Sequence, residues 1–346
     1  MSVLSHAVAL AERGVVPDAL VRAGIRRLLA ARLAEVRAGG AEARRARQQA
    51  LVETMCDGPI AAGPEAANRQ HYELPASFFA AVLGPRLKYS CCLWPVGVDT
   101  LAAAEGAMLE LTCARAGVAD DMEVLDLGCG WGSLSLFVAE RCPRGRVTAV
   151  SNSDTQGEFI RERVRERGLA NLEVVTADLN DFAPARRFDR VLSVEMLEHM
   201  RNWEALLARI ASWLAPEGRL FIHVFCHRDS AYLFEAAGEA DWMARHFFTA
   251  GLMPSEDLLL HFQRDLVVER RWAIDGRHYA RTLEAWLARL DAARERLLPV
   301  LTAVHGAAGA RRALARWRMF FMACAESFAW GGGDEWLIAH ALLAPR

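Results

Sequence analysis

The chain has 346 residues, enough for one large or two small domains, and 53% of them are apolar, enough for a sizeable core. Its formal net charge of −2 gives no electrostatic reason to expect a nucleic-acid partner. The eight cysteines include no CxxC pair, so we expect reduced thiols and no metal site. The sequence shows neither a signal-peptide pattern nor an apolar run of the about 18 residues that span a membrane. We therefore predict a cytoplasmic protein without stable membrane insertion.

The first part of the chain predicts helices. Between residues 1 and 55, apolar side chains recur at helical spacing: Leu20, Val21, Ile25, Leu28, Leu29 and Leu33. The glycines and prolines of residues 58–64 then interrupt the pattern and predict a linker. The sequence thus divides into an N-terminal helical segment, 1–64, and a larger domain, 65–346. The N-terminal helices are compatible with covering a site in the larger domain and with joining two subunits into a homodimer.

From about residue 98, helices alternate with short apolar strands. The helices are expected at 102–116, 134–141, 155–167 and 203–214, and the strands at 123–127, 146–150, 172–177, 189–194 and 219–224. Strands that are apolar on both faces and alternate with helices indicate a parallel sheet covered on both sides. We predict an α/β fold with a Rossmann-like, mostly parallel sheet and helices on both faces.

The remaining third of the chain predicts a cap and closing elements. Residues 228–300 are rich in aromatic side chains and predict a mostly helical insert, although 266–272 is compatible with a late strand. A further helix is expected at 317–330 and a closing strand at 336–343.

A glycine-rich turn, Gly128-Cys129-Gly130-Trp131-Gly132, follows the first predicted strand directly and leads into a helix. Glycine allows positive φ and a close approach of the backbone to a ligand, and the next helix offers free N–H groups. Ligands of open α/β sheets bind at such strand ends. The G-x-G-x-G spacing differs from the G-x-G-x-x-G of dinucleotide enzymes, and a purely structural tight turn remains an alternative.

The next two strand ends supply polar groups suited to a nucleoside. Many nucleoside sites hold the ribose hydroxyls with an acidic residue after the second strand, whereas this chain has Asn152 there and Gln156 in the following helix. After the third strand, Asp178 can accept a hydrogen bond from an adenine amino group while Leu179 packs on the ring. A turn or cap role for Asp178 remains open.

These segments carry a resemblance to a known family. VLDLGCGWGSLSLFVAE, VTAVSNSDTQ and VVTADLNDF resemble the S-adenosylmethionine-binding region of class I methyltransferases. The likeness is more specific to the cyclopropane-fatty-acid-synthase superfamily, and within it to the coclaurine N-methyltransferase-like branch. It covers roughly residues 65–346, through QHYELPASFFAAVLGPRLKYSCCLWP, SVEMLEHMRNWEALL, DWMARHFFTAGLMPSEDLLLHFQ and WRMFFMACAESFAWGGGDEW.

The resemblance implies a methyl donor, S-adenosyl-L-methionine, as the cofactor. It also implies a helical cap formed by the N-terminal segment and the insert after the fifth strand. Tyr89 and Ser90 would reach the methionine end of the donor. The full set of expected donor contacts is Tyr89, Ser90, Asp126, Gly128, Gly130, Gly132, Asn152, Gln156, Asp178 and Leu179.

The fourth predicted strand ends in two carboxylates and an imidazole, Glu195, Glu198 and His199. A protonated amine has no lone pair for methyl transfer, so a nearby base must remove a proton while a carboxylate holds the cation. The resemblance assigns substrate orientation and deprotonation to Glu198 and His199, with Glu195 as a further amine contact. Aromatic faces attract cations, and the expected substrate-binding residues are Tyr72, Phe248, Phe328 and Trp330.

The sequence therefore predicts N-methylation of a small hydrophobic or aromatic amine, its expected small-molecule partner. The alternative is methylene or methyl transfer to an unsaturated phospholipid acyl chain, with bicarbonate held by residues matching Cys91, Glu198, His223 and Tyr279. Against it, Glu195 replaces the small residue usual in the synthases, and the WGGGDEW ending follows the N-methyltransferase pattern. A non-catalytic protein that keeps the donor fold is a third possibility. The intact glycine turn together with Glu198 and His199 argues against it.

Overall fold

A seven-stranded sheet organises the protein, here described from a computed structural model that covers residues 2–61, 74–236, 238 and 241–346. The strand order is β3-β2-β1-β4-β5-β9-β8; β1 to β5 run parallel and β9 runs antiparallel to both neighbours. The prediction of a Rossmann-like, mostly parallel sheet is confirmed. The strands are β1 (Glu123–Leu127), β2 (Arg146–Ser151), β3 (Leu172–Thr176), β4 (Phe188–Val194), β5 (Leu214–His227), β8 (Leu266–Ile274) and β9 (Trp336–Pro345).

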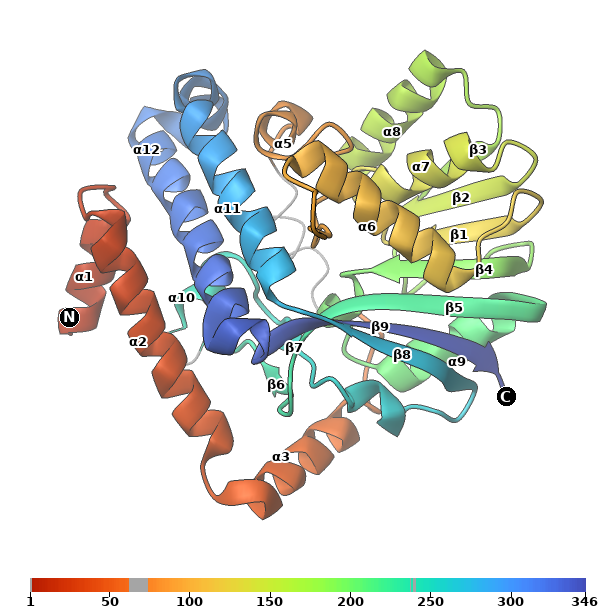
Figure 1. Cartoon of the computed structure of the whole chain (residues 1–346), viewed down its shortest axis with the longest axis horizontal. Coiled ribbons are helices and arrows are strands. Elements are labelled where there is room, and N and C mark those ends of the chain that lie inside the picture. Colours follow the sequence, from red (N-terminus) through yellow and green to blue (C-terminus); the bar gives the residue numbers. More distant parts are fainter. Residues whose placement is uncertain (1, 62–73, 237, 239–240) are drawn as a thin grey trace.

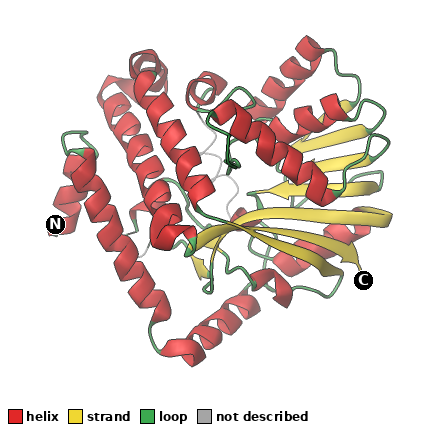
Figure 2. Cartoon of the chain, in the orientation of Figure 1, coloured by secondary structure: helices red, strands yellow, loops and turns green. Residues whose placement is uncertain are grey.

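Both faces of the sheet are buried under helices. Successive side chains of each strand point to opposite sides and so pack into different layers. In β1, Val124 packs into the layer of α6, α7 and α8, whereas Leu125 packs into the layer of α9. In β5, Phe221 and Ile222 divide between the same two layers. Figure 2 shows helices around the yellow sheet. These helices are α6 (Leu101–Ala116), α7 (Ser133–Arg141), α8 (Asp154–Arg167) and α9 (Trp203–Trp213).

A third, aromatic-rich layer lies beside the sheet and brings distant parts of the chain together. Trp286, Trp317 and Phe321 belong to one buried cluster with Leu33 and Phe78. In Figure 1, α2 runs beside α12, so the N-terminal helices pack on the last long helix. The helices of this layer are α2 (Asp18–Arg37), α5 (Ala76–Val82), α11 (Arg277–Ala292) and α12 (Arg294–Ala329).

The N-terminal segment is helical, as expected, but it is broken into three pieces. The additional helices are α1 (Val3–Ala11) and α3 (Gly40–Thr54). Gly39, at φ 77°, separates α2 from α3 in the left-handed conformation that glycine adopts readily. No helix among the described residues combines the length and the apolar character needed to cross a bilayer.

The expectation that residues 228–300 are mostly helical is wrong for the first part of that range. The chain there forms β6 (Tyr232–Leu233), the short α10 (Trp242–His246) and β7 (Leu252–Met253), and β6 pairs with β7. Several aromatic side chains of this part, among them Tyr232, Phe234 and Phe248, line a cavity. Long helix returns only at α11, after β8, which matches the expected late strand.

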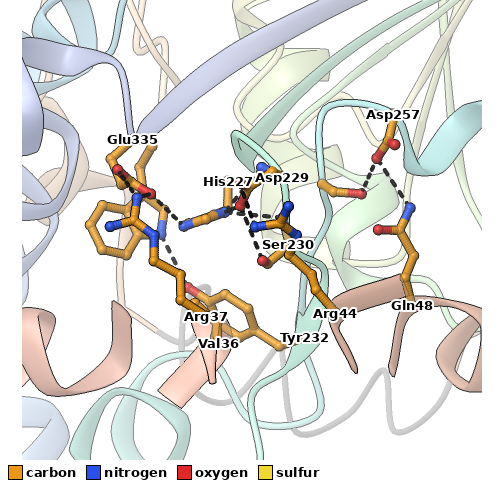
Figure 3. Close-up of polar contacts among 12 residues, drawn as sticks. Val36, Arg37, Arg44, Gln48, His227, Asp229, Ser230, Tyr232, Asp257 and Glu335 are labelled. Atoms are coloured by element: carbon orange, nitrogen blue, oxygen red, sulfur yellow. Dashed lines mark hydrogen bonds and ion pairs between the residues drawn. The ribbon is translucent and has the colours of Figure 1, made fainter. Parts of the chain in front are cut away.

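Polar contacts anchor the α2–α3 elbow to the sheet and its neighbouring loops (Figure 3). We call this set, Arg37, Arg44, Gln48, His227, Asp229, Asp257 and Glu335, the N-terminal clasp. Arg37 donates to both oxygens of Glu335 at 2.6 and 2.7 Å, and Arg44 donates to Asp229 at 3.1 Å. Gln48 extends the set along α3 by donating to Asp257 at 3.1 Å. These contacts tie α2 and α3 to residues that follow the carboxyl end of β5 and precede β9.

Three members of the clasp, His227, Asp229 and Glu335, have the spacing of a possible metal site. The His227 ring opposes that reading. Its Nδ1 accepts from the backbone N–H of Asp229 at 3.2 Å and of Ser230 at 3.1 Å, which leaves the proton on Nε2. That nitrogen lies 3.1 Å from Glu335 Oε1, a carboxylate already bonded to Arg37. The backbone hydrogen bonds to Nδ1 and the Arg37–Glu335 ion pair account for this arrangement, whereas the contact of Nε2 with Glu335 has ion-pair distance but not hydrogen-bond geometry.

The clasp predicts a measurable contribution of Glu335 to stability. Glu335→Ala should lower the free energy of unfolding by about 1–3 kcal/mol, because Arg37 loses a carboxylate that accepts two hydrogen bonds and the buried His227 loses the charge beside it. Urea denaturation measures this difference. Glu110→Ala is the matched control: it removes an ion pair with Arg141 in which both side chains are about half exposed, so a change below about 0.5 kcal/mol is expected. Equal losses in the two variants would contradict the assignment.

Candidate active site

The glycine turn after β1 contains one glycine that faces open space. A Cβ on Gly128 would lie 2.6 Å from Met196, and a Cβ on Gly132 would lie 2.8 Å from Ile160. Both glycines are therefore required by packing as well as by their positive φ. A Cβ on Gly130, at φ 53°, would meet no atom within 4 Å. The backbone at Gly130 thus borders space that a ligand can fill.

Buried polar atoms around this turn fit a polar ligand. Trp131 Nε1, Ser133 Oγ and Gln156 Nε2 are buried and have no hydrogen-bond partner within the protein. Gln156 is held in place because its Oε1 accepts from Ser151 Oγ at 2.8 Å. Leaving such groups unpaired costs about 1–3 kcal/mol each, which a ligand with hydroxyl, amino or carboxylate groups would offset. The turn therefore suits the donor expected from the sequence.

Two further expected donor contacts lie in buried polar surroundings near the turn. Asp126 accepts a hydrogen bond from Ser135 Oγ at 2.5 Å, and burial raises the pKa of Asp126 to about 6. Ser90 accepts from Lys88 Nζ at 2.5 Å, and the same ammonium donates to the Cys91 carbonyl at 2.8 Å. Sequence reasoning missed Lys88. The signal was a lysine directly before Tyr89 and Ser90, in an otherwise largely apolar segment.

The expected ribose and adenine contacts lie at the ends of β2 and β3. Asn152 is exposed just after β2. Asp178 Oδ1 accepts from the backbone N–H of Asn180 at 2.7 Å, so this oxygen caps a turn. Leu179 is buried in the layer beneath α9. The roles of these three residues toward the donor stay predictions.

A cavity of about 630 Å³ lies between the N-terminal helices, α12 and the end of the sheet. Its size is typical of a small-molecule site, and its walls are largely apolar and aromatic. Phe248 and Phe328, both expected in the acceptor site, line the cavity with Tyr89, whereas Trp330 does not line it. Tyr72 lies outside the described residues. Because α1 and α2 form part of the wall, the N-terminal segment contributes directly to this cavity.

Glu195, directly after β4, also lines the cavity and has an unusual backbone conformation at φ 48°. A positive φ is uncommon outside glycine and indicates local strain that the surroundings must support. Three donors meet its carboxylate: the Cys91 backbone N–H at 2.8 Å, the Tyr279 hydroxyl at 2.6 Å and His223 Nε2 at 3.2 Å. These are three of the four residues that the lipid alternative assigns to bicarbonate.

The electrostatics of Glu195 reflect a buried but well-supported carboxylate. Burial raises the pKa of Glu195 above its ordinary value, and the Lys88 ammonium, the Cys91 N–H and the Tyr279 hydroxyl oppose that rise. The charged form is thus held by donors in place of water.

Glu198 lies behind the cavity wall, in the short helix η1 (Leu197–His199). Its side chain is fully buried, and Oε1 accepts from the backbone N–H of Phe225 at 2.8 Å. Burial and then the neighbouring Glu195 carboxylate raise the pKa of Glu198 well above its usual range. Phe225, which sequence reasoning did not single out, lines the cavity and is the residue whose backbone N–H Glu198 holds.

His199 reaches the cavity directly. Its ring centre lies 4.7 Å from that of Phe248, and both residues line the cavity. Burial lowers the pKa of His199 to about 4, while the Glu195 carboxylate acts in the opposite direction. The imidazole is therefore neutral at physiological pH and has a lone pair. The structure thus brings Glu195 and His199 together on the cavity wall. Glu198 does not line the cavity and instead holds the backbone of Phe225, which does.

Comparison with known proteins places these features in a family. A family model described as mycolic acid cyclopropane synthetase matches residues 62–336. (S)-Coclaurine N-methyltransferase from Thalictrum flavum subsp. glaucum is 40% identical over 339 residues, covering 97% of this chain and 94% of that protein. A crystal structure of coclaurine N-methyltransferase bound to N-methylheliamine and SAH has a TM-score of 0.95 and 38% identity, and the match covers 99% of both chains.

At lower similarity, the cyclopropane-fatty-acyl-phospholipid synthase of Escherichia coli (strain K12) is 30% identical over 227 residues, 65% of this chain and 56% of that protein. The N-methyltransferase matches thus extend over the N-terminal helices, whereas the synthase match covers a smaller share of the chain. The resemblance noted in the sequence is confirmed: the chain belongs to the mycolic acid cyclopropane synthetase family of S-adenosylmethionine-dependent methyltransferases.

Proposed function

We infer that the protein transfers a methyl group from S-adenosyl-L-methionine to the nitrogen of a small hydrophobic or aromatic amine. The observation that carries this inference is an apolar cavity in which a supported carboxylate, Glu195, and a neutral imidazole, His199, lie side by side at the end of β4. The names of the relatives support it, because similarity over nearly the whole chain is to coclaurine N-methyltransferases.

In the proposed reaction, the bound donor supplies an electrophilic methyl carbon on a sulfonium. Glu195 holds the incoming ammonium by charge, and Phe248 and Phe328 present ring faces that favour the same cation. Removal from water lowers the ammonium's own pKa, so nitrogen can release its proton to His199 even though burial also lowers the pKa of the imidazole. The freed lone pair forms the N–C bond as the C–S bond breaks, and S-adenosylhomocysteine leaves. Glu198 positions the Phe225 segment behind these groups.

The donor is proposed to lie along Gly130, with Gln156 and Ser133 offering polar partners and Tyr89 and Ser90 at the methionine end. The open space at Gly130 and the unpartnered buried atoms beside it support this placement. The proposal also includes contacts of Asn152, Asp178 and Leu179 with the donor. The boundary between the N-terminal segment and the larger domain at residue 64, a cytoplasmic location and a homodimer are proposed as well.

The lipid alternative is disfavoured by Glu195. The donors of Cys91, His223 and Tyr279, which a bicarbonate would use, all point at the Glu195 carboxylate. An anion added there would face a like charge within hydrogen-bond distance, which is unfavourable in a buried site. A screen with methyl-labelled donor separates the two functions. Labelled amine with S-adenosylhomocysteine release supports our proposal, and labelled phospholipid without amine product contradicts it.

Gly130→Val should abolish binding of the donor, because a branched side chain would occupy the open space beside the turn. Isothermal titration with S-adenosylhomocysteine measures this. Gly168→Val is the matched control: Gly168 has φ 63°, a Cβ there also meets nothing within 4 Å, and it ends α8 away from the turn. Both variants carry the same backbone strain, so equal loss of binding would refute the placement.

His199→Ala should lower kcat by about a hundredfold while leaving donor affinity nearly unchanged, because the variant loses the base but keeps the glycine turn. Steady-state methylation and donor titration give the two quantities. His261→Ala, an exposed histidine in η2 (Leu258–His261), serves as the control and should retain activity. A parallel loss of donor binding in His199→Ala would mean that His199 is structural.

Glu195 should produce the acidic limb of the pH profile. Its pKa is raised above 4.5, so kcat/KM should be full above that pKa and fall as the pH drops through it. Glu195→Gln should remove this limb and lower the plateau. Glu235→Gln, at an exposed glutamate that also lines the cavity, should keep it. An unchanged limb in Glu195→Gln would assign it to another group.

A further inference from the structure

A line of buried hydrogen bonds connects Glu195 to an arginine outside the cavity. His223 Nε2 lies 3.2 Å from Glu195 Oε1, and His223 Nδ1 lies 2.9 Å from His340 Nε2. His340 Nδ1 in turn lies 2.8 Å from a guanidinium nitrogen of Arg115. Both histidines are fully buried, on β5 and β9, while Arg115 belongs to the last turn of α6.

The arginine fixes the direction of every bond in this line. A guanidinium only donates, so His340 Nδ1 must accept and its proton must lie on Nε2. His340 then donates to His223 Nδ1, which forces the His223 proton onto Nε2 as well. His223 therefore donates to Glu195. An ionised Glu195 carboxylate also only accepts, so both ends of the line set the same direction. If Arg115 were absent, the two rings could reverse their tautomers when Glu195 takes up a proton, and the reversed line would stabilise the protonated carboxyl.

We propose that Arg115 is a positioning residue for the methyl-transfer reaction: it locks His340 and His223 in their Nε2–H tautomers and thereby keeps Glu195 supplied with a third hydrogen-bond donor. The proposal rests on the proposed function only in the role it gives to Glu195. The tautomers themselves are a property of the folded protein.

The line does not serve as a route for protons. Each hydrogen bond of the line is donated in the direction of Glu195. A proton that left Glu195 along the line would meet His223 Nε2, which already carries a proton. The outer end of the line is closed by a group that accepts no proton. Burial lowers the pKa of both His223 and His340 well below the ordinary value, and the Arg115 cation acts in the same direction, so the pair stays neutral. The line therefore fixes the direction of the hydrogen bonds and carries no proton to or from Glu195.

Other groups also act on the Glu195 carboxylate, and the test has to separate Arg115 from them. The titratable and charged groups that face it are Lys88 and Cys91 from the loop after α5, Glu198 and His199 from η1, His223 from β5, Tyr279 from α11 and Cys324 from α12. Apart from His223, through which Arg115 acts, none of these side chains is changed by a substitution at Arg115.

Two variants of Arg115 separate a positioning role from a general structural one. Arg115→Met removes the obligatory donor, so the acidic limb of the kcat/KM profile should move up by about one pH unit and kcat/KM near pH 7 should fall up to about tenfold. Arg115→Lys keeps a group that only donates and should restore both toward the parent. The control is Arg270→Met, which removes an exposed cation from the same Trp272 ring that Arg115 contacts, at 5.3 Å against 4.9 Å. Arg270→Met removes one positive charge, as Arg115→Met does, but it leaves the hydrogen bond between Arg115 and His340 intact.

Nitrogen-15 NMR of the histidine rings gives a readout that does not depend on activity. In the parent protein, His223 and His340, assigned with His223→Gln and His340→Gln, should both carry the proton on Nε2. In Arg115→Met, a fraction should move to Nδ1 as the pH falls through the acidic limb, where Glu195 takes up a proton and can donate to His223. An Nδ1–H signal for either ring in the parent overturns the inference, even if Arg115→Met does not fold. So do unchanged tautomers in a folded Arg115→Met, or a pH shift of equal size in Arg270→Met. Failure of the parent to methylate any amine would contradict the proposed function, but not the tautomers.

Discussion

Keeping a buried carboxylate charged is the constraint on which the rest of this site depends. Glu195 sits at the end of β4 with a strained backbone, and burial disfavours its ionised form. The protein offsets this with a backbone N–H from the loop after α5, a hydroxyl from α11 and an imidazole from β5. Elements from three separate parts of the chain must therefore be in place before one side chain can hold a cation.

The same constraint relates this chain to its more distant relatives. In the lipid alternative, a diffusible anion would be bound by side chains that here surround Glu195. In this chain, the Glu195 carboxylate occupies the position toward which the Cys91, His223 and Tyr279 donors point, so no anion has to be bound from solution. Because the carboxylate lines an apolar cavity closed partly by α1 and α2, a cationic acceptor with an apolar body suits it better than an acyl chain. The N-terminal clasp and the packing of α2 on α12 give these helices a defined position in the wall.

Much of this architecture could be predicted from the sequence. The strand bounds near 123–127, 146–150 and 172–177 were readable because short, continuously apolar runs end in glycine or polar turns. The glycine turn and the carboxylate–imidazole strand end were readable because those residue types are rare beside each other. The first half of the expected helical insert was misjudged, because its aromatic side chains, Trp242 and Phe248 among them, line a cavity and do not share one long helix. Arg115, His340 and Phe225 were beyond reach, since their roles depend on which strands become neighbours.

The position of β9 has a consequence for how the protein reaches its active form. It is the last strand along the sequence, yet it lies between β5 and β8, and the His340–His223 contact joins residues 117 positions apart. β8 cannot join the sheet until β9 has paired with β5. Pairings between such distant segments form slowly, because the intervening chain must be ordered first. The parallel strands can therefore form before His340 of β9 meets His223 of β5, so the line from Arg115 to Glu195 is completed only with this last pairing.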